Sequence, residues 1–127
     1  MVPSRDYVRR CLELAEECLE DAQALLRRDR LRAAADRAYY AMYHAAQAVL
    51  YDMGLKPKTH AGLRKMFSEH LVKPKRVNAE FSRALGESFR LRQISDYKAD
   101  AVIDPEKVKD VVKKGAEFLA KMKELVS

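Results

Sequence analysis

The amino-acid sequence predicts an all-α fold, an up-and-down bundle of four or five helices. Apolar residues recur at three- and four-residue steps over long segments, and no segment alternates with a period of two for long enough to form a strand. The chain of 127 residues contains only 4 glycines and 4 prolines, which favours a few long elements with short connections. Helices joined in this way pack as antiparallel neighbours. We expect one domain over residues 1–127.

Capping signals divide the chain into five predicted helices. Ser4 can cap the first helix, and Gly54 is suited to end the second. Thr59 can cap the third helix, and Asp104 followed by Pro105 is typical of the start of another. The predicted helices cover approximately residues 5–28, 31–53, 60–70, 76–97 and 105–125.

The second predicted helix, residues 31–53, is rich in alanine and apolar around most of its circumference. A helix of this kind contacts several neighbours, so we expect it at the centre of the bundle. It is apolar over more of its surface than a four-helix monomer needs. Symmetric self-association is the commonest way to bury such an excess, and we therefore expect a homodimer.

Positive charge is concentrated in one part of the chain. The net charge is +6, and residues 54–92 alone carry ten lysines and arginines against three glutamates, a net charge of +7. A concentrated positive field attracts polyanions such as RNA. The alternative is a well-solvated basic surface without a ligand.

The sequence offers no motif for a metal or a cofactor. It contains no CxxC or HExxH motif and no glycine-rich phosphate loop. The longest stretch without a charged residue, 38–51, has 14 residues, fewer than the ~20 that a membrane span needs. No apolar signal core follows the first charged residues. We therefore expect a cytoplasmic protein with no cofactor, no metal and no membrane contact.

A polar and aromatic stripe marks the second predicted helix. On a helical wheel Arg37, Tyr40 and His44 share one face, about 100° from an apolar face. Such a stripe could line a cleft or a subunit interface. Alternatively, Arg37 pairs with a carboxylate and the tyrosines are half-buried packing residues. The same stripe includes Ala41, Ala48 and Tyr51.

Two further segments carry candidate binding residues. Lys58 and His60 flank Thr59 at the predicted start of the third helix, where backbone N–H groups beside these side chains can hold a phosphate. A plain capping role for Thr59 explains part of this pattern without a ligand. Arg92 continues the inward face of the fourth helix, and Asp96 follows four residues later. A buried guanidinium must be paired or must line a cleft, so this pair either closes the bundle or belongs to a site.

Three ordered segments resemble those of small prokaryotic proteins of the HEPN superfamily. They are RAYYAMYHAA at 37–46, KTHAG at 58–62 and LRQISDY at 91–97. The resemblance covers nearly the whole chain and implies a helical bundle that dimerises through its own helices. It also implies a role in nucleotide or RNA handling, and a minimal nucleotidyltransferase as partner in a toxin–antitoxin-like arrangement.

The catalytic members of this superfamily are metal-independent ribonucleases, whose motif is an arginine followed, after a short spacer, by a histidine. A spacer of four residues after Arg92 leads to Tyr97, and no histidine follows Arg92 in the chain. Arg37 and His44 fit the spacing, but they lie on the second predicted helix, where the family's pair is not expected. A tyrosine, with a pKa near ~10, is a poor general base at neutral pH.

Three functional hypotheses follow from the sequence. The first is a homodimeric HEPN domain that binds a nucleotide, RNA or a partner nucleotidyltransferase. The second is a metal-independent ribonuclease toxin in which Arg92 acts with His44. The third is a non-catalytic helical interaction module. The candidate binding residues are Arg37, Tyr40, His44, Lys58, His60, Arg92, Asp96 and Tyr97.

Overall fold

The computed structural model describes residues 5–126, which form an all-α bundle without a strand. The prediction of the fold class is confirmed. The expected cap Ser4 lies outside the described residues. The helices are α1 (Arg5–Arg27), α2 (Leu31–Asp52), α3 (His60–Phe67), α4 (Ala79–Tyr97) and α5 (Pro105–Leu125), and a π-helical turn, η1 (Ser68–Val72), extends α3.

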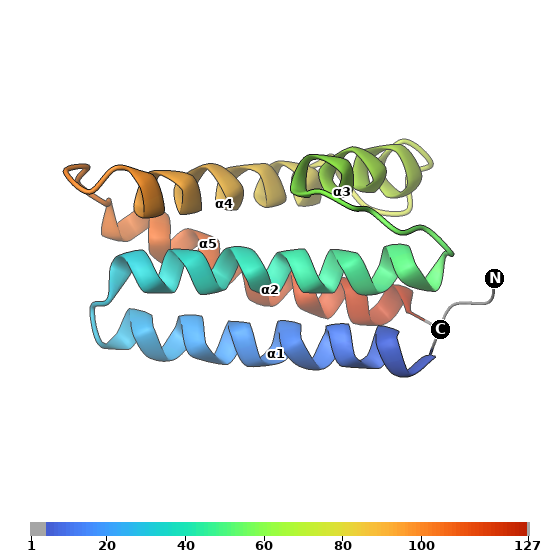
Figure 1. Ribbon diagram of the computed structural model, residues 1–127, viewed down its shortest axis with the longest axis horizontal. Helices are drawn as coiled ribbons and strands as arrows, with labels where there is room; N and C mark the ends of the chain where they lie inside the picture. Colours follow the sequence, from blue (N-terminus) through green and yellow to red (C-terminus); the bar gives the residue numbers. More distant parts are fainter. Residues whose placement is uncertain (1–4, 127) are drawn as a thin grey trace.

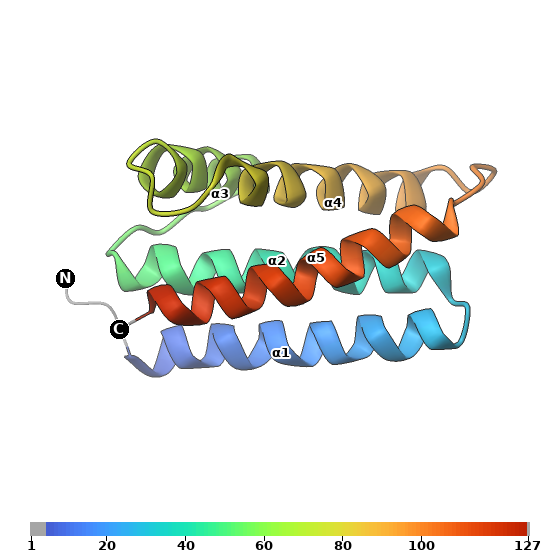
Figure 2. The same cartoon turned by 180° about the vertical axis from the view of Figure 1, so that it is seen from behind.

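The four long helices α1, α2, α4 and α5 run up and down, and α3 is a short helix beside the start of α4 (Figure 1). Seen from behind, α5 crosses the bundle over α2, and α1 and α4 lie on either side of it (Figure 2). Among the α-helices, α2 alone contacts the other four. The expectation that this helix is central is therefore confirmed.

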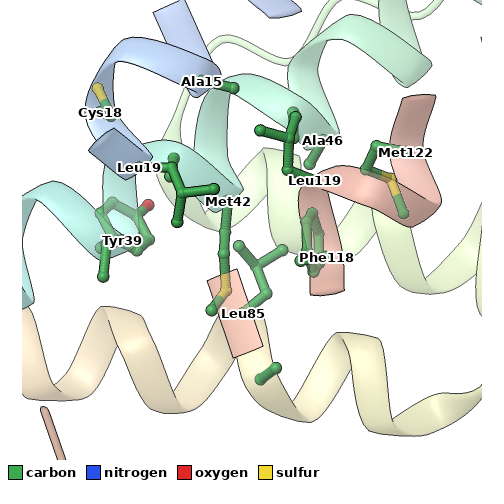
Figure 3. Packing of buried hydrophobic residues seen from close by; sticks show 14 of the residues in the cluster. Ala15, Cys18, Leu19, Tyr39, Met42, Ala46, Leu85, Phe118, Leu119 and Met122 are labelled. Atoms are coloured by element: carbon green, nitrogen blue, oxygen red, sulfur yellow. The ribbon is translucent and has the colours of Figure 1, made fainter. Parts of the chain in front are cut away.

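The core forms where α2, α4 and α5 meet. Met42 of α2, Leu85 of α4 and Phe118 of α5 are fully buried and lie close together (Figure 3). Phe67 of α3 stacks on Phe118, with the ring centroids 5.4 Å apart, which joins α3 to the same core. Truncating a side chain such as Met42 to alanine in a core of this kind costs about 2–5 kcal/mol.

Local signals determine most of the helix ends. Gly54, just after α2, has a φ of +82°. Its N–H donates to the carbonyl of Tyr51 (2.9 Å), and the N–H of Leu55 donates to the carbonyl of Leu50 (2.8 Å). These two hydrogen bonds form a Schellman motif. The Thr59 hydroxyl accepts a hydrogen bond from the Gly62 N–H.

The last helix begins as its sequence predicts. Asp104 accepts a hydrogen bond from the N–H of Glu106, and Pro105 occupies the first helical position. The sequence predicts both roles. Proline suits the first helical position because the N–H that it lacks would have no partner within the helix there.

The connection between α3 and α4 differs from the prediction. The third helix continues to Val72 through η1, and α4 begins at Ala79 rather than near residue 76. Lys75 adopts a φ of +62°, and the N–H groups of Arg76 and Val77 both donate to the carbonyl of Leu71. Val77 is buried, as its apolar character predicts, but it anchors this turn instead of belonging to the helix.

Between residues 5 and 126, no helix is both long enough and apolar enough to cross a bilayer.

Two glycine substitutions should change stability in opposite directions. A Cβ at Gly115 would lie 3.6 Å from Leu19 Cδ1, an ordinary van der Waals distance, so Gly115→Ala should raise the free energy of unfolding by about 0.5–1 kcal/mol through helix propensity. At Gly54 the left-handed backbone conformation disfavours a side chain. Gly54→Ala should therefore lower the free energy of unfolding by about 1–2 kcal/mol. Urea denaturation measures both. A destabilised Gly115→Ala protein would contradict the packing of α5 described above.

Candidate functional site

One stripe of α2 remains only half-buried, while most of its other side chains are enclosed by the neighbouring helices. Arg37, Tyr40 and His44 belong to this stripe, as the sequence predicts. Ala41 and Ala48, which the helical wheel places with them, are fully buried and belong to the core. The half-buried residues of the stripe are Asp36, Arg37, Tyr40, Tyr43, His44, Gln47 and Tyr51.

Four charged side chains join α2 to α4, and we call them the ion-pair cluster. Arg37 Nη2 donates to Asp36 Oδ2 (2.9 Å), and Arg92 Nε donates to Asp36 Oδ1 (3.3 Å). Arg92 Nε also lies 3.1 Å from Asp96 Oδ2. The predicted pair of Arg92 and Asp96 is therefore present. Two arginines and two aspartates give this cluster a formal charge of zero.

Asp36 is the residue that the sequence analysis missed. It accepts from both arginines and connects two helices through Arg92, which is 56 positions away in the chain. A carboxylate in an alanine-rich helix, next to Arg37 and one turn before Tyr40, is the signal that could have identified it.

Aromatic rings surround the ion-pair cluster. The Tyr40 ring contacts two guanidinium groups, with the Arg37 and Arg92 Cζ atoms 5.3 and 5.2 Å from its centroid. Both distances fall within the range of cation–π attraction. The ring cluster consists of Tyr39, Tyr40, Tyr43, His44, His60 and Phe89.

His60 enters the ring cluster from the first turn of α3. Its Nδ1 lies 2.5 Å from the Tyr39 hydroxyl, and its ring centroid is 4.8 Å from that of Tyr43. Burial raises the pKa of Tyr39, so this phenol stays protonated and donates to Nδ1. Burial, followed by the positive charges of Arg92 and Arg64, lowers the pKa of His60. The imidazole is therefore neutral at neutral pH.

His44 is also held in its neutral form. Burial lowers its pKa, a hydrogen bond with Gln47 opposes that shift, and the charge of Arg37 adds to it. His44 Nδ1 lies 3.2 Å from Gln47 Oε1, which places the proton on Nδ1 and leaves Nε2 as an acceptor. The two histidines thus present opposite tautomers to the same surface.

Arg32 fixes the end of α4, where Asp96 is located. Its Nη1 donates to the carbonyl of Ser95 (2.5 Å), and its Nη2 donates to the carbonyls of Lys98, Ala99 and Ala101 at 3.2, 3.1 and 2.6 Å. The carbonyl of Lys98 also accepts from the N–H of Ala101 (3.0 Å), so Arg32 adds to the hydrogen bonding that ends α4. No feature of the sequence near Arg32 predicts this contact.

The structure brings six of the eight predicted binding residues together: Arg37, Tyr40, His44, His60, Arg92 and Asp96. Lys58 and Tyr97 lie outside this network. Both are exposed, Tyr97 to 75%, and within residues 5–126 neither side chain makes a hydrogen bond, an ion pair or a ring contact. In the same range, no three His, Cys, Asp or Glu side chains gather as they would around a metal ion.

The lowered pKa of His60 predicts a pH-dependent stability. In the unfolded chain an imidazole takes up its proton near its ordinary pKa of about 6.5, and in the folded chain only at lower pH. The unfolded state therefore binds more protons in this window, and the free energy of unfolding should fall as pH decreases from 7 towards 5. His44 acts in the same direction. Chemical denaturation at several pH values measures the slope.

His60→Gln should reduce this slope, because it removes one of the two contributing imidazoles. His70→Gln, which removes a histidine outside the ring cluster, is the matched control for the loss of an imidazole. A stability that stays flat from pH 7 to 5 in the wild-type protein would contradict the neutral state of both histidines.

Comparison with known proteins places the chain in a family. A family model described as HEPN domain matches residues 8–125. A UPF0332 protein of Thermotoga maritima is 35% identical over 112 residues, which cover 88% of this chain and 85% of that protein. Two proteins of Methanocaldococcus jannaschii, named "Putative toxin MJ0605" and "Putative toxin MJ0142", are 36% and 32% identical over 80% and 88% of this chain, each alignment covering 76% of the relative. The resemblance found in the sequence is confirmed, and the chain belongs to the HEPN domain family.

Proposed function

We propose that this HEPN protein is the toxin-like member of a toxin–antitoxin-like pair and that it binds RNA or a nucleotide on the surface formed by α2, α3 and α4. The observation that carries the proposal is the contact of Tyr40 with the guanidinium groups of both Arg37 and Arg92 on a half-buried surface. The toxin-like role is supported by the names of the two M. jannaschii relatives.

The chemistry of these side chains suits a nucleic-acid ligand. A half-buried tyrosine or neutral histidine offers a flat face on which a base can stack, worth about 1–3 kcal/mol per base. Arginine side chains next to such rings supply the planar N–H forks that bind phosphate. The basic segment 54–92 lacks tyrosine and has few aromatic residues of its own, and α2 brings Tyr40 and Tyr43 alongside it.

A homodimer and a minimal nucleotidyltransferase partner are further parts of this proposal, and they rest on the family resemblance. The apolar surface of α2, from which the sequence suggests self-association, is covered within the monomer by α1, α4 and α5. Excess apolar surface on this helix is therefore not an argument for a dimer. Sedimentation at micromolar concentration separates a 14.6 kDa monomer from a species of twice that mass.

Metal-independent RNA cleavage is the second candidate function, and one observation favours it. His44 and Arg92 contact the same Tyr40 ring, at 6.0 Å between ring centroids and 5.2 Å from Cζ to centroid. His44 Nε2 could accept the proton of a ribose 2′-hydroxyl while Arg92 stabilises the phosphate charge. Against this, the family's histidine position is occupied by Tyr97, an exposed phenol.

Substitution of Arg92 tests the binding proposal. Arg92→Ala should weaken the binding of a fluorescein-labelled single-stranded RNA octamer at least tenfold. It should also lower the free energy of unfolding by about 1–3 kcal/mol, because Asp36 and Asp96 lose their shared partner in a partly screened site. Arg92→Lys should restore little binding, since an ammonium lacks the planar guanidinium that pairs with Asp36 and Asp96 and contacts the Tyr40 ring. Fluorescence anisotropy and urea denaturation measure the two effects.

The control for this series is Lys113→Ala, which removes an exposed charge from α5 and should bind like the wild type. An Arg92→Ala protein that is destabilised but binds the octamer with full affinity would limit Arg92 to a structural role and remove it from the site.

Cleavage is tested separately, with mixed RNAs incubated with and without EDTA. If the second candidate function holds, cleavage continues in EDTA and is lost in His44→Gln, because the proton acceptor is gone. Intact RNA under both conditions, together with binding of the octamer, leaves binding as the function of this surface.

A further inference from the structure

Arg64 of α3 differs from the two arginines of the ion-pair cluster. Arg37 and Arg92 are paired with Asp36 and Asp96, and the charges of these four groups cancel. Within residues 5–126, no carboxylate lies at ion-pair distance from Arg64. Arg64 therefore contributes an uncompensated positive charge beside the ring cluster.

The Arg64 guanidinium also has an unmatched hydrogen-bond donor. Its Nη1 is buried, and among the described residues no acceptor is within hydrogen-bonding distance of it. Folded proteins leave few buried donors unpaired, and such a group calls for a partner from outside the chain. The residue as a whole is only half-buried, so part of its side chain faces the solvent.

Arg64 lies against the ring cluster. Its Cζ is 3.9 Å from the centroid of Phe89, and Phe89 contacts both Tyr39 and His60, at 5.4 and 6.0 Å between centroids. His60 is one helical turn before Arg64 on α3. A continuous series of ring contacts (Phe89, Tyr39 and Tyr40) thus connects Arg64 to Arg92.

We propose that Arg64 binds a phosphate group of the nucleic-acid ligand, while the balanced ion-pair cluster positions the rings on which a base stacks. The inference rests on the proposed function and deepens it. It assigns the phosphate to a residue on α3 that belongs to none of the three segments of family resemblance. A phosphate supplies both things that Arg64 lacks, a negative charge and hydrogen-bond acceptors.

The test compares Arg64→Met with Lys65→Met. Methionine keeps an unbranched side chain against Phe89 and removes the charge and the unmatched donor. Lys65 is exposed and adjacent on α3, so its substitution removes the same charge without a contact to the rings. Binding of a fluorescein-labelled single-stranded RNA octamer is measured over a range of salt concentrations, and binding of ATP is measured by calorimetry in a separate arm.

Arg64→Met should weaken octamer binding at least tenfold and reduce the slope of log Kd against log salt concentration by about 0.7, the amount for one phosphate of a single strand. Its Tm should equal or exceed that of the wild type, because an unpaired buried donor is removed. Lys65→Met should change the affinity less than threefold. Tyr40→Leu should weaken binding without changing the salt slope. The ATP arm shows whether the phosphate belongs to a polynucleotide or to a free nucleotide.

Three results would overturn the inference. If the wild type binds RNA or ATP and Arg64→Met binds equally well, the proposed function stands and the role of Arg64 does not. If Arg64→Met changes a wild-type dimer into a monomer, its missing acceptor comes from a second copy of the chain. If the wild type binds neither probe at low salt, the proposed function fails, and the assignment of Arg64 fails with it.

Discussion

The alanines of α2 impose the constraint on which the rest of the structure depends. Ala34, Ala38, Ala41 and Ala45 are completely buried, and their small side chains let neighbouring helices approach the axis of α2 closely. With α1, α4 and α5 packed around it, the helix retains one stripe at which polar groups can reach water. The charged and aromatic residues of α2 must therefore share that stripe, which gathers them into one site.

Two residues one turn apart on α2 determine where α4 lies. Asp36 accepts from Arg92 in the last third of α4, and Arg32 donates to the carbonyls at its end. The two contacts are polar and directional, and they add to the apolar packing between the same helices. Packing stabilises the bundle, and these polar contacts fix the register that brings Arg92 to Tyr40.

The sequence predicted those features that depend on neighbouring residues. Apolar periodicity located the helices, and caps such as Gly54 and Thr59 located their ends, because both depend on interactions within a few positions. Features that depend on distant partners were missed. Asp36 and Arg32 meet residues 56 to 69 positions away, and the position of Arg64 beside Phe89 requires the packing of α3 on α4. A helical wheel also does not show whether an alanine such as Ala41 packs into the core or lies on the half-buried stripe of α2.

The contacts of Arg32 have a consequence for how this region can change during evolution. Its guanidinium binds four main-chain carbonyls, and a carbonyl is present whatever amino acid occupies the position. Residues 98–101 can therefore exchange their side chains without losing these contacts. Position 32 has no such freedom, because only arginine carries enough donors in a planar fork to reach all four. The conformation at the end of α4 thus depends on a residue of α2, and the sequence of the loop at 98–101 is free to diverge.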